Sequence, residues 1–249
     1  MTEIHADLRI ALLGNRGTGK SSAANTILDR DAFRVQFSAR AVTQSCERRR
    51  READGRTISV IDTPGLFDTS LTKEQLEAEM ENLARMSDPG LHAFLLVIRL
   101  DVGLSDKEKN MLKWIQKYFG RDATRYTFIL FTHADQLNGE PLDDFVMESL
   151  SFRSLIRSCG GRYHSFNNVD RENRDQVTEL LERITDINKE CHFTLKMFKM
   201  AQNDRHAKEV SLIVAAFGTI LGLGGFLASG GLNWLLVFVC SKPVQQVGD

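Results

Sequence analysis

An eight-residue glycine-rich segment constrains this chain more than any other feature. Residues 14–21 read GNRGTGKS; they follow the apolar run LRIALL at 8–13 and lead into a helix-like stretch that starts at Lys20. This is the pattern G-x-x-x-x-G-K-[S/T] in the strand-to-helix setting that it requires. Glycines let the backbone wrap around an anion, so that several N–H groups and the helix N-terminus point at phosphate oxygens. The segment therefore predicts binding of a nucleoside triphosphate.

The loop residues have distinct expected roles. Lys20 reaches the β- and γ-phosphates, and Ser21 places its hydroxyl on Mg²⁺, a cation that prefers oxygen ligands. The alternative is a chance glycine-rich turn, and the complete pattern in its proper setting argues against it. The expected nucleotide-binding residues of this segment are Gly14, Asn15, Arg16, Gly17, Thr18, Gly19, Lys20, Ser21 and Ser22.

A second motif, Asp62-Thr63-Pro64-Gly65, follows the apolar run at 57–61. An Asp at such a strand end holds Mg²⁺, usually through water, and the Gly offers its N–H to the γ-phosphate. Thr43 is the candidate second Mg²⁺ ligand, with a plain β-branched strand residue as the alternative. The expected metal ligands are thus Ser21, Thr43 and Asp62, and the expected catalytic residues are Lys20, Thr43 and Gly65. Leu66 stands where Ras-like enzymes carry a glutamine that orients water, which predicts slow intrinsic hydrolysis unless a partner or another residue supplies the missing polar group.

A third group of residues is expected to contact the base. The strand expected near 126–131 runs into Thr132-His133-Ala134-Asp135. The Asp135 carboxylate can accept hydrogen bonds from guanine N1 and N2, a pair that adenine lacks. His133 can stack on the purine, or it is simply a partly exposed loop histidine. Asn167 and Asn168, after the last strand, are further candidates for base contact, although Asn residues there also form turns.

Apolar runs alternate with helical patterns along the chain. Strands are expected at 8–13, 43–51, 57–61, 92–98, 126–131 and 163–166, and helices from Lys20 and at 73–87, 105–119 and 142–158. Asp54-Gly55 predicts a hairpin turn, and a charged helical stretch runs from about 171 to 209. This order predicts an α/β fold with a mostly parallel sheet and helices on both faces. Ligands of such folds lie outside the carboxyl ends of the strands.

Composition excludes several function classes. The chain carries 32 Lys and Arg against 33 Asp and Glu, a net charge of −1, so no global field favours nucleic acid. The arginine run at 48–51 is flanked by Glu47, Glu52 and Asp54, which indicates a solvated strand edge. None of the 4 cysteines forms a C-x-x-C pair, and no early apolar run is long enough for a signal peptide. We therefore expect a cytosolic, reducing environment.

The motifs together resemble those of the GTPases of immunity-associated proteins, the GIMAP family, which are related to septins and to chloroplast-import receptor GTPases. The resemblance covers about residues 7–205. It implies guanine specificity, Mg²⁺ dependence, and a GTP-favoured homodimer, or a hetero-oligomer with related GTPases, across the nucleotide face. The matching blocks are GNRGTGKSS at 14–22, AVT at 41–43, VIDTPGLFD at 60–68, HAFLLVIRL at 92–100, THAD at 132–135, and RYH with FNN between 162 and 168.

The chain departs from the family pattern at two places. Relatives commonly carry a Gly-Arg pair after the Ile-Arg-Leu strand, where the arginine can act across a dimer, but residues 101–104 here read DVGL. A switch-region serine of relatives is replaced by Val35. Both changes predict hydrolysis slower than is usual for the family.

The C-terminal part has a different composition. Residues 210–241 contain no charged side chain, a length of 32 that exceeds the ~20 residues of a membrane-spanning helix. We expect a nucleotide-binding domain at 1–205 with a helical extension, and a hydrophobic anchor at 206–249 with a span at about 210–228. The domain would then face the cytosol on an intracellular membrane. A hairpin packed on protein is the alternative for the anchor, and Cys240 is an inert thiol or a palmitoylation site.

Three functions fit these features. The first is a Mg²⁺-dependent GTP-binding switch that hydrolyses GTP slowly and dimerises on a membrane. The second is a GTP-dependent membrane scaffold with negligible hydrolysis. The third is an ATP-using, kinase-like enzyme, which the expected base contact of Asp135 disfavours.

Overall fold

The computed structural model describes residues 7–36, 42–53, 55–65, 71–187 and 192–220. Some predicted features lie outside these ranges. They include Leu66 and the segment 221–249, which contains Cys240 and much of the expected anchor. In chain order, the helices and strands are β1 Leu8–Leu13, α1 Lys20–Leu28, β2 Glu47–Ala53, β3 Arg56–Asp62, α2 Lys73–Met86, β4 Gly90–Leu91, β5 Ala93–Arg99, α3 Asp106–Lys109, α4 Met111–Phe119, η1 Arg121–Tyr126, β6 Thr127–Thr132, η2 Ala134–Leu137, α5 Leu142–Glu148, α6 Leu150–Ser158, β7 Tyr163–Phe166, α7 Asp175–Ile187, β8 Phe193–Thr194 and α8 Leu195–Ile220.

A six-stranded sheet forms the centre of the fold. Its order is β2-β3-β1-β5-β6-β7, and all neighbours are parallel except the β2–β3 hairpin. All six residues of β1 are buried, because the strand is covered on both faces and therefore needs no polar side. The hairpin pairs Ala53 with Arg56, and Gly55 has a φ of 69° that glycine adopts without strain. The predicted α/β fold with a mostly parallel sheet is confirmed.

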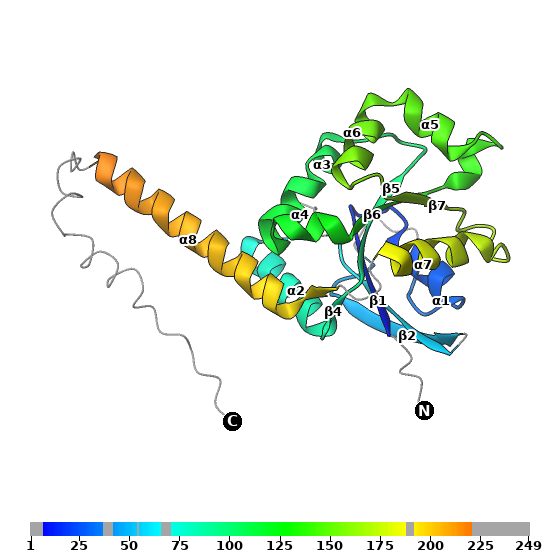
Figure 1. The fold of residues 1–249 in the computed structure, drawn as a ribbon, viewed down its shortest axis with the longest axis horizontal. Coiled ribbons are helices and arrows are strands. Elements are labelled where there is room, and N and C mark those ends of the chain that lie inside the picture. Colours follow the sequence, from blue (N-terminus) through cyan, green and yellow to red (C-terminus); the bar gives the residue numbers. More distant parts are fainter. Residues whose placement is uncertain (1–6, 37–41, 54, 66–70, 188–191, 221–249) are drawn as a thin grey trace. The chain divides into compact units, whose positions relative to one another are not determined.

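Helices cover the two faces of the sheet in separate groups (Figure 1). Helices α1 and α7 pack on one face, where Ile27 and Leu180 are fully buried in one apolar cluster. Helices α2, α4 and α6 pack on the other, where Leu83, Ile115 and Phe152 belong to a second cluster. The sheet therefore separates two cores, and the carboxyl ends of its parallel strands meet at one edge.

Three helical predictions need correction. The expected helix at 105–119 is two helices, α3 and α4, because Asn110 turns its amide back to the Asp106 carbonyl oxygen at 2.9 Å. The expected helix at 142–158 is likewise α5 and α6, separated by Ser149 in an extended conformation. The stretch from 171 to 209 contains α7, the two-residue strand β8 and the start of α8 rather than one helix. The short strands β4 and β8 pair with each other and had no sequence signal.

The chain divides into two compact units, residues 1–202 and 203–249. The sheet and the site described below belong to the first unit. Among the described residues, no helix combines enough length with enough apolar character to span a bilayer. The expected span at 210–228 lies only in part within α8, which ends at Ile220.

Candidate functional site

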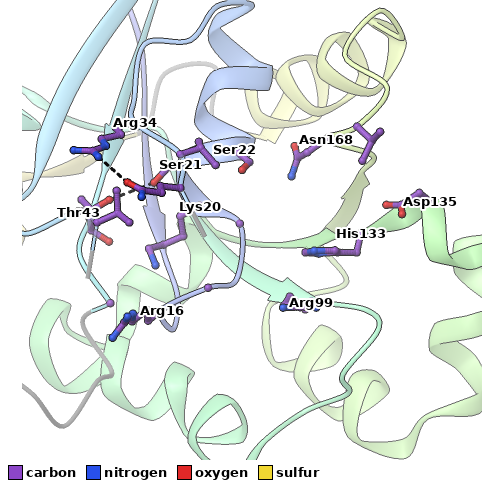
Figure 2. Close-up of a pocket in the computed structure, with 18 residues that line it drawn as sticks. Arg16, Lys20, Ser21, Ser22, Arg34, Thr43, Arg99, His133, Asp135 and Asn168 are labelled. Carbon is purple, nitrogen blue, oxygen red and sulfur yellow. Dashed lines mark hydrogen bonds between the residues drawn. The ribbon is translucent and has the colours of Figure 1, made fainter. Parts of the chain in front are cut away.

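A pocket of about 490 Å³ opens at the carboxyl ends of the parallel strands. Its volume falls within the ~300–1,000 Å³ typical of small-molecule sites. Figure 2 shows basic and hydroxyl side chains at one end, including Arg16, Lys20 and Thr43, and His133, Asp135 and Asn168 at the other. The lining residues are Arg16, Gly17, Gly19, Lys20, Ser21, Ser22, Arg34, Val35, Gln36, Val42, Thr43, Thr63, Gly65, Arg99, His133, Asp135, Asn168 and Val169.

The loop between β1 and α1 lines this pocket. Its backbone geometry requires glycine at several positions. Gly17 and Gly19 have φ angles of 76° and 87°, which disfavour any side chain. A Cβ at Gly14 would lie 2.7 Å from the Val97 carbonyl oxygen. Gly19 immediately precedes α1 and has no side chain to cap its first turn, so the helix N–H groups remain directed at the pocket. This arrangement has the geometry to bind an anion.

Two hydrogen bonds stabilise the conformation of this loop. The Thr18 hydroxyl donates to the Asn15 carbonyl oxygen at 2.9 Å, and the Thr132 hydroxyl donates to the Thr18 carbonyl oxygen at 2.8 Å. Gly14, Asn15 and Thr18 thus shape the loop without lining the pocket. The loop conformation is therefore fixed by the protein itself.

Lys20 is almost completely buried, with 7% of its surface exposed. Its ammonium donates to the carbonyl oxygens of Gly14 and Asn15, at 3.2 and 2.8 Å. Burial lowers the pKa of Lys20 to about 8, and nearby Asp62 opposes that shift. The ammonium is desolvated and donates to neutral carbonyl oxygens, with the charge of Asp62 nearby, so it gains from a phosphate placed against it.

The three expected metal ligands meet at one point. The Ser21 hydroxyl donates to Asp62 Oδ2 at 2.6 Å, and the Thr43 hydroxyl donates to the same oxygen at 3.1 Å. The two hydroxyl oxygens are 3.3 Å apart. The other carboxylate oxygen, Asp62 Oδ1, is buried and has no hydrogen-bond partner among the described residues.

Burial raises the pKa of Asp62, and the hydrogen bond from Ser21 and the charge of Lys20 oppose that rise. A buried carboxylate with one unsatisfied oxygen, next to two hydroxyls, provides the hard oxygen donors that suit Mg²⁺. The donor set therefore fits the ion that the motif implies.

The base-side residues come from the ends of β6 and β7. His133 has a φ of 62°, and its Nδ1 lies 3.0 Å from the Thr132 hydroxyl oxygen. The Asp135 carboxylate accepts a hydrogen bond from Gln136 Nε2 at 2.6 Å and lines the pocket. Asn168 lines it too, and its Oδ1 accepts from Thr26 at 2.9 Å, which leaves the amide N–H groups as donors.

Asn167 is placed differently from its neighbour Asn168. Its Oδ1 accepts from the backbone N–H groups of Val169 and Asp170, at 2.9 and 3.1 Å. It is absent from the described lining of the pocket and acts here as a turn residue.

Sequence reasoning missed two cations of the pocket, Arg34 and Arg99. Arg99 ends β5 and forms a two-point ion pair with Asp101, with contacts of 2.9 and 2.5 Å. Its place at a strand's carboxyl end was a usable signal, since such positions border the ligand. Arg34 donates to Gln36 at 2.6 Å and lies in a segment with no motif.

Comparison with known families identifies the chain. The model of the AIG1 family matches residues 8–211, most of the chain. The chain belongs to the AIG1 family. AIG1 relatives include human "GTPase IMAP family member 8", 34% identical over 177 residues, which cover 71% of this chain and 26% of that protein. Another is "Immune-associated nucleotide-binding protein 1" of Arabidopsis thaliana, 33% identical over 72% of this chain and 83% of the relative.

The resemblance to the GIMAP family is thereby confirmed. This AIG1 chain spans 26%, 53% and 63% of the lengths of the first three curated relatives it matches. Among solved structures, it resembles Toc33 from Arabidopsis thaliana in complex with GDP and Mg²⁺, with a TM-score of 0.55 and 21% identity. That match covers 73% of this chain and 84% of Toc33. At this identity the likeness establishes the fold.

Proposed function

We propose that this AIG1 protein is a Mg²⁺-dependent guanine-nucleotide-binding switch that hydrolyses GTP slowly. The observation that carries the proposal is the meeting of Ser21, Thr43 and the partly unsatisfied Asp62 carboxylate beside the buried Lys20. Two relatives whose names specify nucleotide binding or GTPase activity support it, as does the neighbour solved with GDP and Mg²⁺.

The phosphates would lie on the loop at the N-terminus of α1. Backbone N–H groups of the loop would bind them, Lys20 would neutralise the β- and γ-phosphates, and the Gly65 N–H would donate to the γ-phosphate. Ser21 and Thr43 would ligate Mg²⁺, with Asp62 reaching it directly or through water. Bound Mg²⁺ would supply positive charge that offsets the negative charge of the phosphates.

The base would lie at the other end of the pocket, which favours guanine. The Asp135 carboxylate can accept from guanine N1 and N2, and the Asn168 amide can donate to guanine O6. Adenine offers neither match. His133 would border the purine.

Calorimetric titration of the full chain in Mg²⁺ tests this assignment. GTP and GDP should bind and ATP should not, whereas heat from ATP alone would favour a kinase-like enzyme. Asp135→Asn should exchange the preference for guanine for a preference for xanthine, because xanthine offers an acceptor where guanine offers an amino group. Asp122→Asn, an exposed aspartate outside the pocket, is the matched control. No heat from GTP or GDP, or unchanged GTP affinity in Asp135→Asn, would contradict the proposal.

The same pocket supports a GTP-dependent dimer. Val35 and Val169 line its mouth and are 56% and 83% exposed, and Val102, in the loop after β5, is 63% exposed. A second subunit placed across the nucleotide face would remove these apolar side chains from water, which favours association. Sedimentation with GDP and with a non-hydrolysable GTP analogue tests this: a dimer only with the analogue supports it, and a monomer with both nucleotides opposes it.

Leu66, in the position of the water-orienting glutamine, favours a second candidate, a scaffold that assembles with GTP and hardly hydrolyses it. Absence of phosphate release in single-turnover assays would select the scaffold. We also propose that the uncharged segment 210–241 attaches either form to the cytosolic face of a membrane. Flotation of the full chain with liposomes would support attachment, and failure to float would oppose it.

A further inference from the structure

We propose that Arg16 is a catalytic residue that acts within its own subunit during GTP hydrolysis. This inference rests on the proposed function, since it places Arg16 against the γ-phosphate of bound GTP. Arg16 would supply charge stabilisation at the γ-phosphate of a chain in which Leu66 cannot orient the attacking water.

The position of Arg16 follows from a close contact between two backbone segments. A Cβ added to Gly65 would lie 3.0 Å from the Arg16 backbone nitrogen and 3.1 Å from the Arg16 Cβ. The segment expected to sense the γ-phosphate therefore touches the phosphate loop at Arg16. The Arg16 side chain is exposed and lines the pocket beside this contact.

Figure 2 shows Arg16 near Lys20, at the end of the pocket away from Asp135. The other two pocket arginines belong to other segments of the chain. Arg99 is paired with Asp101, and Arg34 donates to Gln36 in a segment outside the loop. Arg16 is thus the pocket arginine whose backbone belongs to the phosphate loop and adjoins Gly65.

A guanidinium in this position suits the reaction. During hydrolysis the water oxygen bonds to the γ-phosphorus while the bond from that phosphorus to the bridging oxygen breaks. The bonding electrons remain on the β-phosphate of GDP, and the proton of the water ends on the released phosphate. Negative charge on the γ-phosphoryl oxygens and the bridging oxygen is stabilised by a permanently charged, planar donor. Because Arg16 is carried by the loop itself, its contribution needs no second subunit.

Single-turnover hydrolysis of radiolabelled GTP on the full chain tests the role. Arg16→Ala should lower the rate constant by about 100-fold or more, while the affinities for GDP and GTP change by less than about threefold. Arg16→Lys should recover part of the rate, because it keeps the charge and loses the planar fork. Arg153→Ala, which removes an exposed arginine from α6, should leave the rate unchanged.

A mixing experiment separates action within one subunit from action across two. Arg16→Ala loaded with labelled GTP is mixed with excess wild-type protein that carries a non-hydrolysable GTP analogue. The slow rate should persist in the mixture. Rescue by the wild-type partner would overturn the proposal, as would an unchanged or faster rate in Arg16→Ala alone. An equal loss of GDP affinity, GTP affinity and rate would also overturn it, because Arg16 would then serve binding only. Failure of wild-type protein to bind GTP would instead refute the proposed function.

Discussion

Thr132 joins the phosphate loop to the end of β6, and its replacement by valine tests how much that connection contributes to nucleotide binding. Thr132 is fully buried, and its hydroxyl donates to the Thr18 carbonyl oxygen at 2.8 Å. Valine has a similar shape but no hydroxyl, so Thr132→Val leaves the Thr18 oxygen without this donor and also removes the hydroxyl that lies 3.0 Å from His133 Nδ1. The loop should then be less rigidly held in the conformation that receives phosphate.

A matched control lies at the other end of the same strand. Thr127 is also fully buried, and its hydroxyl donates to the Ala123 carbonyl oxygen at 2.9 Å, far along the strand from the loop. Loss of one buried hydrogen bond with an acceptor left unsatisfied costs about 1–3 kcal/mol. Both variants should therefore reduce the free energy of unfolding by a similar amount within that range. Only Thr132→Val should weaken GDP binding, by about 5- to 10-fold, or about 1–1.4 kcal/mol.

Urea unfolding followed by circular dichroism measures the first quantity, and titration with a fluorescent GDP analogue in Mg²⁺ measures the second. Similar slopes of the unfolding curves for both variants would show that the comparison is valid. The reasoning would be refuted if the two variants lost GDP affinity equally. It would also be refuted if Thr132→Val lost stability while GDP affinity stayed unchanged.

Three further predictions follow from single side chains. Burial, followed by the charges of Arg9 and His192, lowers the pKa of His92 from 6.5 to about 4, so the unfolded chain takes up a proton before the folded chain does. The free energy of unfolding should fall by about 1–2 kcal/mol, discounted for partial exposure, as pH drops from about 6.5 to about 4, and urea titrations of His92→Asn should show a smaller fall. Asn25→Ala should lose about 2–4 kcal/mol in urea unfolding, because Asn25 exchanges two hydrogen bonds, of 2.9 and 2.8 Å, with the buried Phe33 backbone. Ser21→Ala should weaken GDP binding by at least about tenfold in Mg²⁺ but little in EDTA, as measured by calorimetry.

Each of these has its own control. In the protein, His92 Nδ1 accepts a hydrogen bond from the Arg9 backbone N–H at 3.0 Å, and Asn can also accept it. If His92→Asn leaves the pH dependence of stability unchanged, the fall in stability comes from other groups. His164, whose pKa is also lowered by burial, is one such group. Asn173→Ala, an exposed asparagine, should change stability by less than about 0.5 kcal/mol and calibrates Asn25→Ala. If Ser21→Ala loses the same GDP affinity with and without Mg²⁺, Ser21 is not a ligand of the metal.

The sequence predicted the parallel strands well because they are buried, short, apolar and bounded by loop motifs, whereas the strand expected at 43–51 is β2 at Glu47–Ala53 and does not include Thr43. It failed where a single polar side chain divides a helical pattern. Asn110 donates to the Asp106 carbonyl oxygen, and the Ser149 hydroxyl accepts from the Phe152 N–H at 3.3 Å. Such local hydrogen bonds compete with the helix backbone, and the apolar period continues across them. The two-residue strands β4 and β8 are too short to show any period.

Site residues could be predicted where they belong to motifs with a characteristic spacing. Ser21 and Asp62 are 41 positions apart, were expected in one metal site, and are hydrogen-bonded in the structure. Spacing is uninformative for adjacent residues of one kind. Asn167 and Asn168 have the same chemistry, yet only Asn168 lines the pocket, because an irregular loop has no period that tells inward from outward positions. Arg99 lies in the matching block at 92–100, but that block gave it no role, and it reaches the pocket because it ends β5.

The edge position of β2 has a consequence for how this protein meets other molecules. In the described part of the chain, β2 pairs with β3 alone, so its other side presents backbone groups to which a foreign strand could add. Four consecutive arginines occupy this strand; Arg49 and Arg50 are exposed, and Arg51 pairs with Asp29 at 3.2 Å. Two such strands brought edge to edge would place exposed arginine side chains of both close together, although Arg49 is paired with Glu47 at 2.9 Å. We therefore expect the arginine run to disfavour aggregation through this edge of the sheet. Specific assembly would then use other faces of the domain.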